Sequence, residues 1–177
     1  MILKEFIQYW MNMAESVKDQ KDERRDELMS FFCYYIAFNH IFDGNCQRRK
    51  CKSCSDDVEN CFTCYEKRKI KHLITNTLPI FKEKGMHFNP FCALNEYSEL
   101  LTNVKADKYN QSIKVNLDVF YNDKSYKNIC ELFCNIHQVR CNLFHGAKDM
   151  STYRDQDLVK ESSDLLKIFL KAYLQLL

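Results

Sequence analysis

Hydrophobic residues recur at three- and four-residue steps along most of the chain, which is the spacing of one face of an α-helix. The pattern predicts helices over 1–18, 22–42, 65–78, 91–104, 124–145 and 153–177. The apolar positions of the second segment are too dense for one narrow stripe, so we expect it to be the central helix. Gly44 and Pro79 are expected to end the second and third helices. Gly146 is expected to close the fifth in the left-handed conformation.

Two stretches lack this helical periodicity. Residues 43–66 form a cysteine-rich insert with few apolar positions of their own. In 105–122, the apolar residues Ile113, Val115, Leu117 and Val119 alternate, which fits either a short strand or an extended connector. We therefore expect both stretches to connect helices and to stand outside the periodic helical pattern.

The composition favours one ordered, all-α domain. The chain has 177 residues, of which 46% are hydrophobic and 28% charged, so it is long and apolar enough to fold around its own core. It contains only 3 Gly and 2 Pro, too few for a turn-rich β sandwich or barrel. We predict a single antiparallel helical bundle over residues 1–177, with the loop insert at 43–66.

Charge and hydropathy restrict the partners. The formal net charge of +2 creates no strong global field, so an anionic partner would have to bind to local basic patches. The first six residues carry charges where a signal peptide would be apolar, and the longest apolar run, 31–38, is too short to span a bilayer. We expect a cytoplasmic protein without a membrane partner.

Four of the 10 cysteines have the spacing of metal ligands. Cys51 and Cys54 form one Cys-x2-Cys pair, and Cys61 and Cys64 form a second pair six residues later. Four thiolates satisfy tetrahedral Zn²⁺ and leave no open position for a substrate, so we predict a structural zinc ion. Unliganded cysteines and an iron–sulfur cluster are the alternatives, and Cys46 is either a substitute ligand or a bystander.

The remaining cysteines lie in helical patterns and are expected to be small buried hydrophobes. These are Cys33, Cys92, Cys130, Cys134 and Cys141.

Basic residues flank the cysteine pairs. Four precede or interrupt the first pair and four follow the second: Arg48, Arg49, Lys50, Lys52, Lys67, Arg68, Lys69 and Lys71. They could hold an RNA backbone. Equally, they could form a solvated surface that nearby acids neutralise: Asp56, Asp57, Glu59 and Glu66.

The candidate chemistry lies in the octet Val-Arg-Cys-Asn-Leu-Phe-His-Gly at 139–146. Arg140 can hold phosphate oxygens and His145 can transfer protons near neutral pH, with Asn142 as a polar group between them. Five residues separate Arg140 from His145, which places them roughly 140° apart around an ideal helix. They would act together only if the last turn loosens or if two copies of the chain meet. We expect a composite site that needs two chains.

The same residues also permit a purely structural interpretation. Arg140 could be a buried side chain that pairs with a carboxylate, and His145 could cap carbonyls at the helix end. His137, three residues before Arg140, could line the same cleft, although a surface or core position is the simpler expectation.

The octet resembles the R-x4-6-H motif of the HEPN superfamily. The aromatic segment 31–39, the residues Ala147, Lys148 and Asp149, the pair Arg154-Asp155 and the leucine-rich last helix are also similar. Together the resemblance covers roughly 22–42 and 126–177. Members often carry a polar residue directly after the arginine, where this chain has Cys141.

The resemblance implies a dimeric helical bundle in which the two motifs face each other. It further implies a metal-independent endoribonuclease of toxin–antitoxin or anti-phage defence systems, with Arg140 and His145 as the catalytic pair. RNA, a second copy of the chain and a neutralising protein are then the expected partners. The alternative is a catalytically inactive HEPN-like RNA-binding or protein-interaction module that uses the zinc knuckle.

Overall fold

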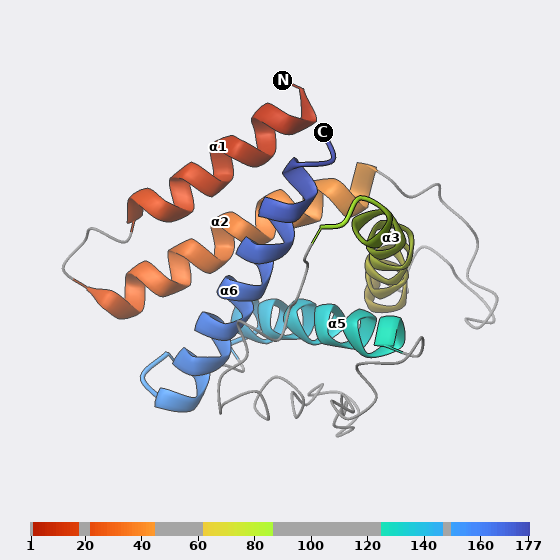
Figure 1. Ribbon diagram of the computed structural model, residues 1–177. Helices are drawn as coiled ribbons and strands as arrows, with labels where there is room; N and C mark the ends of the chain where they lie inside the picture. Colours follow the sequence, from red (N-terminus) through yellow and green to blue (C-terminus); the bar gives the residue numbers. More distant parts are fainter. Residues whose placement is uncertain (1, 18–21, 45–61, 87–124, 147–149) are drawn as a thin grey trace.

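The computed structural model describes residues 2–17, 22–44, 62–86, 125–146 and 150–177. Within these ranges the ordered elements are helices, so the all-α prediction is confirmed for the described part of the chain. Figure 1 shows how the helices are arranged. They are α1 (Leu3–Ser16), α2 (Glu23–Gly44), α3 (Phe62–Glu83), α5 (Ser125–Phe144) and α6 (Tyr153–Leu174).

Helix α2 is the centre of the bundle, as its dense apolar pattern predicts. It packs against α1, α6 and α3, and the hairpin of α1 and α2 is antiparallel (Figure 1). Helices α3 and α5 form a second antiparallel pair, because Lys67 contacts Gln138 whereas Lys71 contacts Glu131. The two pairs and α6 thus enclose one core.

Aromatic rings from three helices meet in that core. The ring centroid of Phe38 on α2 lies 5.3 Å from that of Phe133 on α5 and 5.6 Å from that of Phe169 on α6. Phe133 and Phe169 are 5.1 Å apart. All three rings are fully buried, and each burial contributes roughly 1.5–3 kcal/mol. This cluster fixes α5 against α2 and so positions the octet.

The expectation that Pro79 ends the third helix is wrong. Helix α3 begins at Phe62, not at residue 65, and continues past Pro79 to Glu83. It continues because Leu78 and Phe81 on either side of the proline are buried in the core. Gly85, at φ +64°, ends it instead, and the Met86 amide donates to the Phe81 carbonyl at 2.8 Å.

Helix α5 ends as the sequence predicts. Gly146 has φ +69°, the left-handed conformation that favours glycine, and its amide donates to the Leu143 carbonyl at 3.3 Å. The His145 amide still donates to the Cys141 carbonyl at 3.0 Å. The helix is therefore regular from Arg140 to its end at Phe144, and the His145 amide continues its hydrogen-bond pattern.

Several expectations lie outside the described residues. These are the helix at 91–104, the alternating segment 105–122, and Cys46, Cys51, Cys54 and Cys61. The backbone of Cys64 lies in the first turn of α3. Because α2 ends at Gly44 and α3 begins at Phe62, the connection between these helices is shorter than the predicted insert. In the described part of the chain, no helix is long and apolar enough to cross a membrane.

Candidate functional site

Arg140 lies in the last turns of α5, half-buried between aromatic rings. Its guanidinium carbon is 4.5 Å from the ring centroid of Phe144 and 5.7 Å from that of Tyr35. Both distances are within the range in which a cation is attracted to the face of an aromatic ring. The two rings therefore hold the guanidinium at the surface and restrict its orientation.

A polar cluster centred on His137 lies behind Arg140. The Tyr35 hydroxyl oxygen is 2.6 Å from Nδ1 of His137, and Cys141 Sγ is 3.4 Å from Nε2. The same Nε2 lies 3.2 Å from Oε2 of Glu66 on α3. If Tyr35 donates to Nδ1, the Nε2–H is directed at the sulfur and the carboxylate, and both ring nitrogens have a partner. Three helices thus meet at one imidazole.

Burial keeps this imidazole neutral. His137 is only 1% exposed, and burial, aided by the nearby charges of Lys67 and Arg140, lowers its pKa to about 4. Burial also raises the pKa of Glu66, which the positive charge of Arg140 partly opposes. His137 therefore occupies a core position, and the arginine has a carboxylate nearby, as the structural interpretation expects.

His145 lies apart from this cluster. It follows the last residue of α5 and is exposed. Among the described residues, no hydrogen bond or ion pair connects Arg140 with His145, in agreement with their predicted angular separation around the helix. Asn142 is only 4% exposed, and its Oδ1 accepts a hydrogen bond from Gln138 at 2.8 Å. In a single chain His145 is thus exposed and Arg140 is half-buried, whereas Asn142 is buried.

Basic residues at the start of α3 contact neighbouring helices. Lys69 forms an ion pair with Asp43 at the end of α2, and Lys71 forms one with Glu131 on α5. Lys67 donates to the Gln138 side chain at 3.3 Å. These lysines contribute to packing, whereas Arg68 is exposed.

The thiols that the structure describes are not arranged as a metal site. Cys33, Cys130 and Cys134 are buried, as expected, and burial raises the pKa of each. Cys141 is half-buried beside Arg140. No group of three metal-ligating side chains occurs among the described residues. The four predicted zinc ligands fit tetrahedral Zn²⁺ by donor type and spacing, and their side chains lie outside that part.

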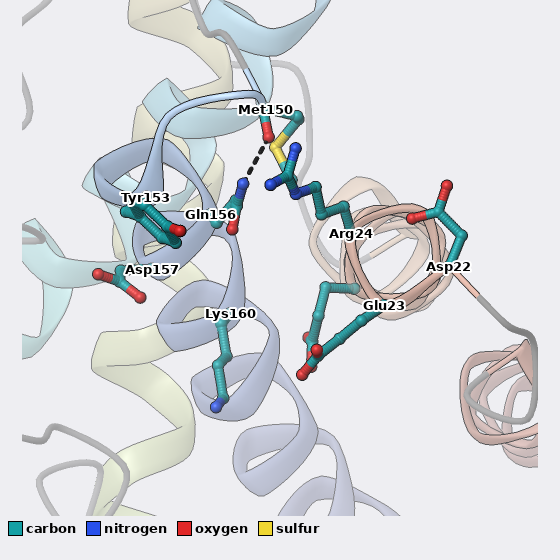
Figure 2. A pocket seen from close by; sticks show the side chains of 9 residues that line it. Asp22, Glu23, Arg24, Met150, Tyr153, Gln156, Asp157 and Lys160 are labelled. Carbon is teal, nitrogen blue, oxygen red and sulfur yellow. Dashed lines mark hydrogen bonds between the residues drawn. The ribbon is translucent and has the colours of Figure 1, made fainter.

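A separate groove lies between the beginnings of α2 and α6 (Figure 2). It encloses about 700 Å³. Acidic side chains outnumber basic ones in its lining: Asp22, Glu23, Glu27 and Asp157 against Arg24 and Lys160. An acidic excess repels phosphate, so this groove is not suited to an RNA backbone.

Tyr35 and Glu66 have no role in the predicted site, although both lie against His137 in the structure. Tyr35 is 102 residues from His137 in the chain, and Glu66 comes from a third helix. Local spacing carries no information on such contacts, so no signal in a single sequence identifies them.

No protein-family model matches this chain, and no curated protein or solved structure is detectably similar to it.

Proposed function

We propose that this protein is a metal-independent endoribonuclease of the HEPN type, with Arg140 and His145 from two copies acting at one phosphodiester. The observation that supports this most is an accessible guanidinium, held by two rings, at the same helix end as an exposed imidazole. These are the two functional groups that the reaction requires.

The substrate provides its own nucleophile. The ribose 2′-oxygen attacks the adjacent phosphorus while an imidazole accepts its proton, and the bond from phosphorus to the 5′-oxygen breaks. The imidazole that accepts this proton is that of His145, and once protonated it returns the proton to the departing 5′-oxygen. Arg140 stabilises the charge that develops on the phosphorane oxygens. The products are a 2′,3′-cyclic phosphate and a 5′-hydroxyl.

A second copy of the chain is needed because α5 is regular between the two groups. Met29 and Ile36 leave apolar side chains exposed on the outer face of α2, and Phe32 of the same helix contacts Phe144 beside Arg140. These side chains form an apolar surface next to the octet, against which a second copy of the chain can pack. In a two-fold dimer, the arginine of one chain can then approach the histidine of the other.

The other parts of the proposal concern the zinc ion and the biological setting. Zn²⁺ held by Cys51, Cys54, Cys61 and Cys64 would order the insert without taking part in the chemistry. A metal-free nuclease that degrades cellular RNA must be controlled. A role as a toxin or anti-phage effector in the cytoplasm, restrained by a neutralising protein, fits that requirement.

The second candidate is a protein on the same scaffold that binds RNA without cutting it. It is favoured by Glu66, whose carboxylate competes with phosphate for the charge of Arg140. It is also favoured by Cys141, which stands where HEPN nucleases often have a polar residue.

The test compares purified wild-type protein with Arg140→Ala and His145→Ala on a mixed RNA pool in excess chelator. We expect the wild type alone to cut and to leave 2′,3′-cyclic phosphates, with each variant reduced at least about 100-fold. His72→Ala is the matched control, because His72 is an exposed histidine on α3. A strict requirement for added magnesium would contradict the proposal. If the wild type and both variants bind RNA equally and none of them cleaves it, the second candidate is favoured.

A further inference from the structure

Phe144 has an exposed ring beside the two groups assigned to the chemistry. It is the last residue of α5, directly before His145, and its side chain is 64% exposed. A phenylalanine this exposed gains little of the stabilisation that burial would give. Its only contact with another aromatic ring among the described residues is with Phe32, at 5.3 Å between centroids and 58° between planes. Phe32 and the guanidinium of Arg140 thus lie against the ring, and the rest of its surface is open to solvent.

The contact with Arg140 distinguishes this ring from the other exposed aromatic side chains. The guanidinium carbon of Arg140 lies 4.5 Å from the Phe144 centroid. Tyr153 is more exposed, at 80%, but in the described part of the chain no cation lies over its ring. Phe144 thus combines an open aromatic surface with an adjacent phosphate-binding cation.

An unpaired nucleotide offers groups that match both features. Its phosphate suits a guanidinium, and its base has an aromatic face that stacks on a phenylalanine ring regardless of base identity. A base inside an A-form duplex is already stacked between its neighbours and cannot reach the ring. The pairing of Arg140 and Phe144 therefore selects single strands, loops and bulges.

We propose that Phe144 is a stacking platform for one unpaired base of the RNA whose phosphate Arg140 binds. The inference rests on the proposed function and adds to it a residue that determines specificity. It makes Phe144 a contact for the substrate itself, rather than a support for the arginine alone.

The test measures RNA binding in the full-length His145→Ala protein, which leaves the bound strand uncut. Labelled single-stranded oligonucleotides are titrated with this protein with and without Phe144→Leu, which keeps an apolar side chain but removes the aromatic face. We expect Phe144→Leu to weaken binding about tenfold or more and Phe144→Tyr to bind like the unaltered ring. Tyr153→Leu is the matched control for removing an exposed aromatic residue and is expected to have no effect.

Oligonucleotides with one abasic position separate base stacking from support of Arg140. If a base stacks on Phe144, removing that base at one position abolishes the difference in affinity between the proteins with and without Phe144→Leu, since no base remains to stack. A ring that only supports Arg140 would give the same loss with every oligonucleotide, which would overturn the inference. Duplex RNA is expected to bind about tenfold or more weakly than the single strand.

Three further outcomes would also overturn the inference. If Phe144→Leu converts a dimer to monomers in sedimentation, and binding recovers once the dimer is restored at higher concentration, the ring belongs to the subunit interface. If wild-type protein neither binds nor cuts RNA, the proposed function fails as well. If the wild type cleaves RNA but Phe144→Leu weakens binding equally for abasic and intact oligonucleotides, only the role of Phe144 is refuted and the proposed function stands.

Discussion

At the scale of single residues, the two histidines near Arg140 have different environments. His137 is enclosed by Tyr35, Cys141 and Glu66, whereas His145 is exposed at the helix end. Only an accessible imidazole can exchange protons with a bound substrate. The exposed position of His145 makes it the better candidate for proton transfer, and the buried position of His137 makes it a determinant of stability.

His137 should make stability depend on acid pH. Its pKa is lowered from 6.5 to about 4 in the folded protein, so the unfolded chain binds more protons between these values. Its contribution is complete above pH 6.5 and is lost as the pH falls towards 4. Relative to His137→Gln, we expect the wild-type free energy of unfolding to fall by about 2–3 kcal/mol between pH 7 and pH 4. If urea unfolding gives the wild type and His137→Gln the same dependence of unfolding free energy on pH, the prediction is contradicted.

Glu161 on α6 should have the opposite effect near neutral pH. The side chain is 3% exposed, and neither carboxylate oxygen has a hydrogen-bond partner in the described part of the protein. Burial, together with Asp157 and Asp164, raises its pKa to about 8. The folded protein therefore retains a proton that the unfolded chain loses above its pKa of about 4.5, and stability decreases as the pH rises from 4.5 to 8.

Glu161→Gln should remove this loss. We expect the variant to gain about 2 kcal/mol over the wild type between pH 5 and pH 7, measured as the difference in unfolding free energy. Asp157→Asn is a useful comparison, since it removes one of the neighbouring charges and keeps the buried carboxylate. A variant that is less stable than the wild type at pH 7 would mean that Glu161 has a charged partner.

At the scale of elements, α3 shows how far local rules can predict structure. The proline has no amide hydrogen to donate to the Thr75 carbonyl, and its ring crowds that turn, which argues for a helix end. The helix continues because Leu78 and Phe81 are buried in the bundle. Burial of both side chains outweighs a penalty of about 3 kcal/mol.

Pro79→Ala should therefore stabilise the protein. Alanine restores the missing amide donor and relieves the crowding, so we expect the free energy of unfolding to rise by about 1–3 kcal/mol. The urea midpoint is the measurement, with Lys82→Ala on the exposed side of the same helix as a control that changes the unfolding free energy by less than about 0.5 kcal/mol. A lower midpoint for Pro79→Ala would show that the proline is needed for a bend.

Helices could be predicted from this sequence because their signals are local. The apolar period of α2 and the glycine after α5 each act within a few residues, and the structure agrees with both. The surroundings of Arg140 could not be predicted, because Tyr35 and Glu66 approach it only when three helices pack together. The angular separation of Arg140 and His145 followed from helix geometry alone.

At the scale of the whole molecule, the aromatic centre of the core comes from helices outside the cysteine insert. The buried cluster of Phe38, Phe133 and Phe169 joins α2, α5 and α6, and none of these rings lies near the predicted zinc ligands in the sequence. Removing a structural zinc should then affect the insert far more than the helices.

Chelation tests this separation. After removal of Zn²⁺, we expect the far-ultraviolet circular dichroism of the helices to be largely retained, while proteolysis becomes faster between residues 45 and 61. The double substitution Cys51→Ser and Cys54→Ser should behave in the same way without chelator. Complete loss of helical signal would show that the metal supports the entire fold.

The central claim is that Arg140 of one chain and His145 of another act on the same phosphodiester. Its most direct test is to coexpress Arg140→Ala and His145→Ala chains with different tags and to purify the mixed dimer. Each variant alone should be inactive, and the mixed dimer contains one intact site, so it should recover up to about half of the wild-type cleavage rate. A mixed dimer as inactive as its parents would contradict the composite site.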